Sequence, residues 1–210
     1  MIRVIVVDDH AIVRRGLVSI LDASEDMSCV AEGSNAAETM RAIRDNDAEA
    51  LVLDVSMPGK DGIEVLKQIK KERPRLPVLI LSSHSEDQYA LRSIRAGAAG
   101  YLNKTSAPQQ LLAAIRQIAA GRKFITPELA QSLADHIESP TDGPVHGALS
   151  DREFQTLKLI GSGYSLTQVA DKLCLSVKTV SVYRARLLEK MQMKNNAELT
   201  RYAIEQGLVD

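Results

Sequence analysis

The chain has 210 residues, of which 45% are hydrophobic and 25% are charged, and its 26 basic and 27 acidic side chains give a net charge of -1. These values are ordinary for a globular protein, and the balanced charge gives no global sign of a nucleic-acid or membrane partner. The longest aliphatic runs, such as 4–7 and 78–81, are far shorter than the roughly 18 apolar residues of a membrane-spanning helix.

Several features place the chain in a reducing compartment. The first residues lead directly into a strand-like run, so we expect no signal peptide. The two cysteines, Cys29 and Cys174, cannot build a disulfide framework and stand among apolar residues, so we expect buried free thiols. The sequence therefore predicts a cytoplasmic protein that does not associate with membranes.

The first 120 residues alternate between two hydrophobic periodicities. Strand-like runs occupy 2–7, 28–31, 50–54, 78–82 and 98–102. Segments with helical spacing lie between and after them, at 11–22, 35–45, 61–73, 86–95 and 107–119. This alternation predicts an α/β domain with a doubly wound, five-stranded parallel sheet. Ligands of such sheets bind at the carboxyl ends of the strands.

The pattern changes after about residue 124. One further helix is predicted over 127–137, and residues 138–147 contain two prolines and two glycines, which is typical of a linker. Four helices are predicted at the end of the chain, over 151–162, 166–173, 177–191 and 196–206. We therefore expect three parts: an α/β domain over 1–122, a helix and linker over 123–147, and a small all-α domain over 148–210.

Acidic side chains stand at the predicted strand ends. Asp8 and Asp9 follow the first strand, Asp54 ends the third, Ser82 ends the fourth and Lys104 follows the fifth. Carboxylates that converge at one sheet edge repel each other, and a divalent cation such as Mg²⁺ relieves this repulsion. A carboxylate beside a cation can also accept a phosphoryl group. The alternative is that each aspartate only caps a helix or keeps a loop soluble.

The motifs around these residues resemble a response-regulator receiver domain over 1–122. They are Val6-Val7-Asp8-Asp9-His10, Leu53-Asp54 followed by Val55 to Gly62, Leu81-Ser82-Ser83, and Gly97 to Lys104. The resemblance implies that Asp54 is the phosphoacceptor and that Lys104 and Ser82 contact the phosphoryl group. It also implies that Mg²⁺ is held by Asp9, Asp54 and the backbone carbonyl of Ser56, with Asp8 acting through water.

The same resemblance implies that Tyr101 is an aromatic switch that turns inward when Ser82 moves. The plainer interpretation of Tyr101 is an amphipathic residue at a sheet edge. The chain departs from many receivers in having Thr105, and not proline, after Lys104. A trans bond is therefore expected here, because a cis bond without proline costs about 3–4 kcal/mol.

The segment 172–194 is strongly basic. It carries six basic residues and a single acidic one, Glu189. Within the predicted helix 177–191, Val180, Tyr183, Leu187 and Met191 form one apolar face. The opposite face carries Lys178, Ser181, Val182 and Ala185, flanked by Arg184 and Arg186. Together with the helix 166–173 this predicts a helix-turn-helix with its second helix in the DNA major groove. The alternative is a helical bundle with a solvated basic face.

Residues 149–208 resemble the NarL/FixJ (LuxR-type) DNA-binding domain. The resemblance rests on Leu149 to Glu153, Gly163-Tyr164-Ser165, Val169 to Leu173, Lys178-Thr179-Val180 and Glu189-Lys190-Met191. The string 179–188 is most similar to members of the BvgA and UvrY/GacA type. The implied DNA-contacting residues are Lys178, Thr179, Ser181, Val182, Arg184, Ala185 and Arg186. We expect the cationic ones to neutralise phosphates, Val182 to contact a thymine methyl group, and Ser181 to suit either base edge.

These resemblances imply a response regulator, not an enzyme, that transfers phosphate only onto its own aspartate. The expected partners are a sensor histidine kinase, double-stranded DNA and a second copy of the chain, with RNA polymerase as a further candidate. The surface 86–122 is the expected place of coupling between phosphate and output. Two alternatives are a carboxylate-nucleophile phosphatase and a phosphate-independent DNA-binding or protein-interaction module, in which the receiver serves only as a scaffold. The histidines His10, His84, His136 and His146 show no ligand spacing and are expected to be solvated.

Overall fold

The computed structural model describes residues 1–210 except 56, 58–61, 83–85, 128, 132–144 and 210. The chain forms two compact units, Met1–Ile137 and Glu138–Asp210. Among the described residues, no helix has the length and apolar character needed to cross a membrane.

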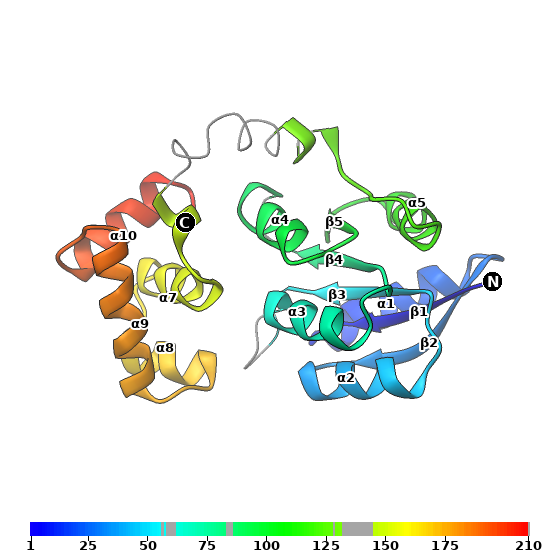
Figure 1. The fold of residues 1–210 in the computed structure, drawn as a ribbon, viewed down its shortest axis with the longest axis horizontal. Helices are drawn as coiled ribbons and strands as arrows, with labels where there is room; N and C mark the ends of the chain where they lie inside the picture. The colour runs from blue at the N-terminus through cyan, green and yellow to red at the C-terminus, as the bar shows by residue number, and fades with distance from the viewer. Residues whose placement is uncertain (56, 58–61, 83–85, 128, 132–144, 210) are drawn as a thin grey trace. The chain divides into compact units, whose positions relative to one another are not determined.

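The N-terminal unit contains one parallel sheet with the strand order β2-β1-β3-β4-β5 (Figure 1). The strands are β1 (Ile2–Val7), β2 (Met27–Gly33), β3 (Ala50–Asp54), β4 (Val78–Ser82) and β5 (Gly100–Asn103). The helices are α1 (Ala11–Asp22), α2 (Ala36–Asp45), α3 (Gly62–Glu72), α4 (Glu86–Arg95) and α5 (Pro108–Ala119). The predicted doubly wound α/β fold is confirmed.

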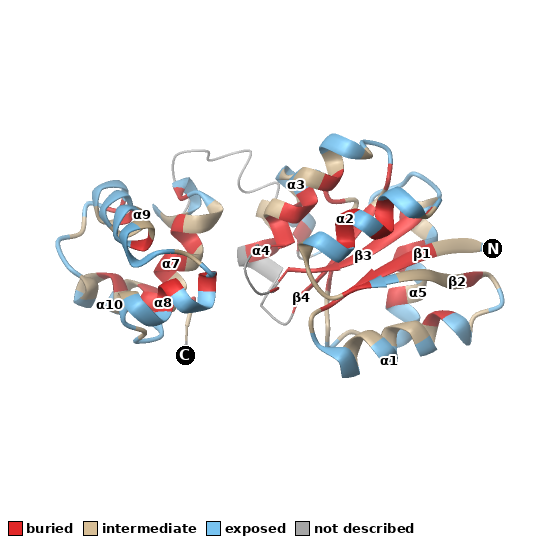
Figure 2. Ribbon diagram, turned by 90° about the horizontal axis from the view of Figure 1, so that it is seen from below, coloured by how far each residue is buried: buried red, intermediate tan, exposed pale blue. Residues whose placement is uncertain are grey.

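The two faces of the sheet are covered by different helices. Apolar side chains of α1 and α5, such as Leu21 and Ile115, pack with Val4, Val52 and Leu81 from the sheet. Helices α2, α3 and α4 lie over the other face (Figure 2). Strands β3 and β4 are buried along their whole length, as expected for the centre of a parallel sheet that is covered on both sides.

One strand starts later than its sequence predicts. Gly97 has a φ of 102° and closes α4, and the Ala98 amide donates to the Ser93 carbonyl at 2.9 Å. Because residue 98 still belongs to this helix end, β5 begins at Gly100. Beyond α5, Phe124 forms a parallel bridge with Gly100 at the edge of β5. Residues 127 and 129–131 are helical, and the rest of the helix predicted over 127–137 lies outside the described residues.

The C-terminal unit is helical throughout its described part. It contains the short 3-10 helix η1 (Val145–Ala148) and the helices α7 (Asp151–Gly161), α8 (Leu166–Leu173), α9 (Val177–Lys190) and α10 (Asn196–Glu205). The predicted capping box at the start of α7 is present, since Ser150 accepts from the Glu153 amide and Glu153 accepts from the Ser150 amide. Buried residues from all four α-helices, including Phe154, Val169, Leu187 and Leu199, form the core of this unit (Figure 2).

Two expectations change in this unit. Residues 145–148, which overlap the predicted linker, form η1, and His146 Nδ1 lies 2.9 Å from the Tyr202 hydroxyl oxygen, so this histidine is half-buried and not simply solvated. The expected burial of Cys174 is wrong. This residue is exposed because it ends α8 in a left-handed conformation, with a φ of 52°. Cys29 is half-buried on β2, and burial raises the pKa of its thiol to about 11.

Candidate functional site

Carboxylates converge at the carboxyl ends of β1 and β3. The two strands are neighbours, with Val7 paired to Leu53, so the residues that follow them meet at one edge of the sheet. Asp8 and Asp54 are buried, and Asp9 is half-buried. Ligand atoms of these three aspartates and of His10 all lie within 4.8 Å of one another. The sequence-based expectation of an acidic cluster thus matches the geometry of the fold.

The ammonium of Lys104 lies between two of these carboxylates. Lys104 Nζ is 2.7 Å from Asp8 Oδ2 and 2.9 Å from Asp54 Oδ2. Burial alone lowers the pKa of this amine, but the carboxylates of Asp54 and Asp8 outweigh that effect and the pKa is raised. The backbone holds Lys104 in place, because its amide donates to the Ser82 carbonyl at 2.8 Å. No described peptide bond is cis, so the bond from Lys104 to Thr105 is trans, as expected.

Ser82 and Tyr101 stand on the two strands beside the acidic cluster. Ser82 is buried at the end of β4 and is in register with Asn103 of β5. Tyr101 lies on β5, the edge strand of the sheet, and is fully buried, so its ring lies inside the unit. Ser56, whose backbone carbonyl the receiver resemblance places at a metal site, lies outside the described residues.

Two residues at this site were not singled out from the sequence as site residues. His10 Nδ1 lies 2.7 Å from Asp9 Oδ1, although the imidazole is 65% exposed. Arg14 donates to the Asp8 carbonyl at 2.7 Å and pairs with Glu32 at 3.0 Å. The spacing of His10 and Arg14 is one helical turn, which brings α1 side chains back toward the end of β1. The place of His10 directly after Asp9 could have pointed to the first residue, and the one-turn spacing to the second.

The cluster has the donor set of a site for a hard divalent cation. Asp8, Asp9 and Asp54 each turn one oxygen away from solvent. Buried carboxylate oxygens at this density need positive charge nearby, and Lys104 supplies a single cation beside three carboxylates. The residues present therefore fit Mg²⁺ or a similar ion.

The second candidate site is the exposed side of α9. Helix α8 ends at Leu173, and α9 begins after a short turn with Ser176 as N-cap, which accepts from the Thr179 amide at 3.0 Å. Val180 and Leu187 are fully buried, so the opposite side of α9 is presented outward. This is the two-helix arrangement predicted from the sequence.

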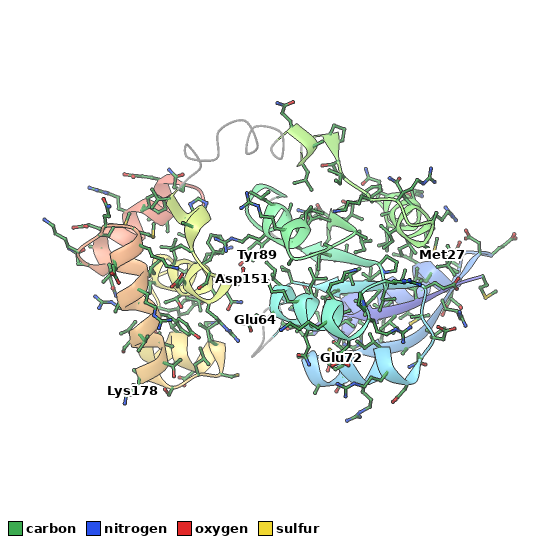
Figure 3. All side chains as sticks on the ribbon, in the orientation of Figure 1. Met27, Glu64, Glu72, Tyr89, Asp151 and Lys178 are labelled. Atoms are coloured by element: carbon green, nitrogen blue, oxygen red, sulfur yellow. The ribbon has the colours of Figure 1, made fainter. Side chains whose placement is uncertain are left out.

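The residues expected to contact DNA differ in their exposure and in the hydrogen bonds that they make within the protein. Five of them are exposed: Lys178, Ser181, Val182, Ala185 and Arg186. Figure 3 shows the side chain of Lys178 pointing away from the C-terminal unit at the start of α9. Thr179 is half-buried, and its hydroxyl is 2.8 Å from that of Ser176. Arg184 is half-buried and donates to Asn196 Oδ1 of α10 at 2.6 Å, so its guanidinium is partly committed within the protein.

An ion pair fixes the far end of α9. Lys190 Nζ lies 2.7 Å from Glu153 Oε2, and the Glu153 side chain is almost fully buried. Burial raises the pKa of this carboxyl, but the bonds from Lys190 and Ser150 outweigh it, so the pKa is lowered. Glu153 therefore caps α7 and anchors α9 at the same time.

Comparisons with known proteins identify both units. The model of the response regulator receiver domain matches residues 4–116, and that of the bacterial regulatory proteins of the luxR family matches residues 147–203. The chain is 35% identical to the response regulator GacA of Pseudomonas aeruginosa, over 100% of this chain and 99% of the relative. It is also 35% identical to the response regulator UvrY of Escherichia coli, over 99% of this chain and 96% of the relative.

A solved structure supports the same assignment. RcsB from Salmonella enterica serovar Typhimurium, bound to the promoter rprA in the presence of the phosphomimetic BeF3-, has a TM-score of 0.66 and 28% sequence identity to this chain. The similarity covers 96% of this chain and 97% of that one.

Proposed function

The chain belongs to the response regulators that carry a receiver domain and a LuxR-family DNA-binding domain, and from this premise we propose that phosphorylation of Asp54 controls its binding to DNA. The family assignment confirms both resemblances inferred from the motifs, and the chain is a transcription regulator of the two-component type. The observation that carries the proposal is the contact of the Lys104 ammonium with the buried Asp54 carboxylate at 2.9 Å.

Asp54 is the best-placed phosphoacceptor. It is buried at the end of β3, where a phosphoryl group on its carboxylate would lie beside the Lys104 cation. A sensor histidine kinase would donate the phosphoryl group. The chain would promote this transfer only onto its own aspartate and onto no other substrate. Mg²⁺ held by Asp9, Asp54 and the Ser56 carbonyl, with Asp8 through water, would offset charge on the phosphoryl oxygens. Lys104 and Ser82 would contact those oxygens.

The switch would then run through Ser82 and Tyr101. A phosphoryl group near the end of β4 gives the Ser82 hydroxyl a new partner, and Tyr101 lies on the adjoining strand. A local change in charge is enough to shift the equilibrium between two conformations of this kind. The surface formed by residues 86–122, beneath which Tyr101 is buried, is the proposed place of coupling.

The output would be a dimer on double-stranded DNA. One α9 offers few base contacts, so two copies on paired half-sites are needed for a specific site. Lys178 and Arg186 would neutralise phosphates, and Arg184 would do so only with the guanidinium nitrogens not used by Asn196. A chain that acts on DNA in this way would work in the cytoplasm, and RNA polymerase is a candidate partner there. We place the domain limits at 1–122, 123–147 and 148–210.

Intact-mass measurement with Mg²⁺ and acetyl phosphate tests the phosphoacceptor. Wild type should gain one phosphoryl group, which hydroxylamine removes, and Asp54→Asn should gain none. Asp45→Asn, which changes an exposed aspartate at the end of α2, is the matched control and should behave as wild type. An adduct on Asp54→Asn, or none on wild type, would contradict the assignment.

DNA titration tests the output. Lys178→Ala should weaken binding to all sequences and lower the salt slope by about one unit. Lys123→Ala is the control, because Lys123 is an exposed lysine of the other unit. Equal salt slopes for both variants would exclude α9 as the DNA contact.

A further inference from the structure

The exposed side of α9 changes character along the helix. Lys178 stands at its start and Arg186 near its end, and both can donate hydrogen bonds. Between them the outward residues include Ser181 and Val182, and Val182 is 44% exposed. Arg184, which also stands between them, is half-buried and donates to Asn196 Oδ1 of α10 at 2.6 Å. The middle of the proposed groove-facing surface therefore presents short side chains, and not the long donors that usually read guanine.

The hydroxyl of Ser181 is already used as a donor. Its Oγ donates to the Val177 carbonyl, one helical turn earlier, at 2.9 Å. Ser181 carries one hydroxyl hydrogen, so its remaining capacity is that of an acceptor. The nearby Thr179 hydroxyl is paired with Ser176, which caps the helix. The Ser181 hydroxyl thus presents its lone pairs outward. The sequence-based expectation that Ser181 suits either base edge narrows to contacts with hydrogen-bond donors of the bases.

Acceptors and apolar groups select bases by what the major groove displays. An acceptor pairs with the amino group of adenine or cytosine, and an apolar side chain suits the methyl group of thymine. An A·T pair offers both features. Guanine offers only acceptors, which neither Ser181 nor Val182 can satisfy, and leaving them desolvated is costly.

We propose that Ser181 and Val182 select an A·T pair at the centre of each half-site. Ser181 would accept a hydrogen bond from adenine N6, and Val182 would contact the thymine methyl group. This inference rests on the proposed function, since it assumes that α9 enters the major groove. Lys178 and Arg186, at the ends of the surface, keep the phosphate contacts of the proposed function.

The test begins with selection of binding sites from random DNA by the full-length chain, with Mg²⁺ and acetyl phosphate present. The selected half-sites should share an A·T pair at a central position. Replacement of that thymine by uracil removes only the methyl group and should weaken wild-type binding about fourfold. Replacement of that adenine by purine removes only the amino group and should weaken binding about fivefold.

Protein variants assign each effect to a residue. Val182→Ala should bind the thymine and uracil sites equally, and it should keep the preference for adenine over purine. Ser181→Ala should lose the adenine preference and keep the thymine preference. Ile204→Ala is the control, because Ile204 is an apolar residue of the same unit that is 54% exposed on α10. It should retain both preferences.

The outcomes separate the inference from the function on which it rests. Tight binding with central G·C pairs, or wild-type binding that ignores both base replacements, would overturn the inference and leave DNA binding intact. Failure to select any DNA would overturn the proposed function and the inference with it. Base preferences that survive in both α9 variants would show that other residues read the pair.

Discussion

The Lys104 ammonium lies 2.9 Å from the Asp54 carboxylate, at the carboxyl ends of the strands of a parallel sheet. The same nitrogen is 2.7 Å from Asp8, so one cation serves two buried anions. Removal of one member of a buried ion pair leaves an uncompensated charge, which is more costly than the loss of a surface pair. The stability of this unit without a metal should therefore depend on Lys104.

We expect Lys104→Met to lower the free energy of unfolding of the receiver unit by about 3 kcal/mol in EDTA at pH 7. Because the pKa of Lys104 is raised, its contribution is complete below pH 10 and is lost only as pH rises further. The loss caused by the variant should thus persist in full at pH 9 in denaturant titrations. Adding Asp54→Asn to the variant removes a charge and should restore part of the stability. No recovery in the double variant would contradict this account.

Addition of Mg²⁺ provides a second measurement at the same site. An ion that binds only the folded state stabilises it in proportion to RT ln(1 + [L]/Kd). Wild type should unfold at higher denaturant concentration as Mg²⁺ rises, and Asp9→Asn should respond much less, since it lacks one proposed ligand. Asp45→Asn should respond as wild type does. An equal response of Asp9→Asn would remove Asp9 from the metal site.

Gly62 packs α3 directly against the chain that follows Asp54. A Cβ atom on Gly62 would lie 2.6 Å from Val55 Cα, and the Gly62 amide donates to the Val55 carbonyl at 2.9 Å. Gly62→Ala should destabilise the unit by about 1–3 kcal/mol and slow the formation of the Asp54 adduct, because the backbone beside Asp54 must move. The matched control is Gly16→Ala, where a Cβ atom meets nothing within 4 Å. That change in α1 should stabilise the helix by up to about 1 kcal/mol and leave adduct formation unchanged.

The pair of Glu153 and Lys190 should make the C-terminal unit sensitive to acid. The pKa of Glu153 is lowered in the folded state, so its stabilising contribution is present above the unfolded value near 4.3 and is lost as pH falls through the folded value. Lys190→Met should cost about 1–2 kcal/mol at pH 7, a reduced figure because Lys190 is 43% exposed. The variant should also lose less stability than wild type between pH 5 and pH 3. Lys178→Met, on the same helix but outside the pair with Glu153, should show wild-type acid unfolding.

Position along the strands explains what could be predicted from the sequence. Asp8 and Asp54 follow adjacent strands of a parallel sheet, so the alternation of strands and helices was enough to bring them together. The contact of His10 with Asp9 depends on a side-chain rotamer at the start of α1, and local periodicity does not report rotamers. Glu153 and Lys190 are 37 residues apart, and only the packing of α7 against α9 brings them into contact. Cys174 looked buried because its neighbours are apolar, but the left-handed end of α8 turns it outward.

The chain that leaves the receiver unit after α5 is attached to the edge of β5 at Phe124. The Phe124 amide donates to the Ala99 carbonyl at 2.9 Å, and a Cβ atom on Gly100 would lie 2.9 Å from the Phe124 carbonyl oxygen. Gly100→Ala should therefore push residues 123–126 away from the strand that carries Tyr101. We expect faster hydrogen exchange at the Phe124 amide and faster tryptic cleavage after Lys123. Gly147→Ala, where a Cβ atom meets nothing within 4 Å, is the control and should change neither.

If this attachment links Tyr101 to the output, acetyl phosphate should alter cleavage after Lys123 in wild type but not in Gly100→Ala. The same phosphate response in both proteins would show that the coupling runs elsewhere on the surface 86–122.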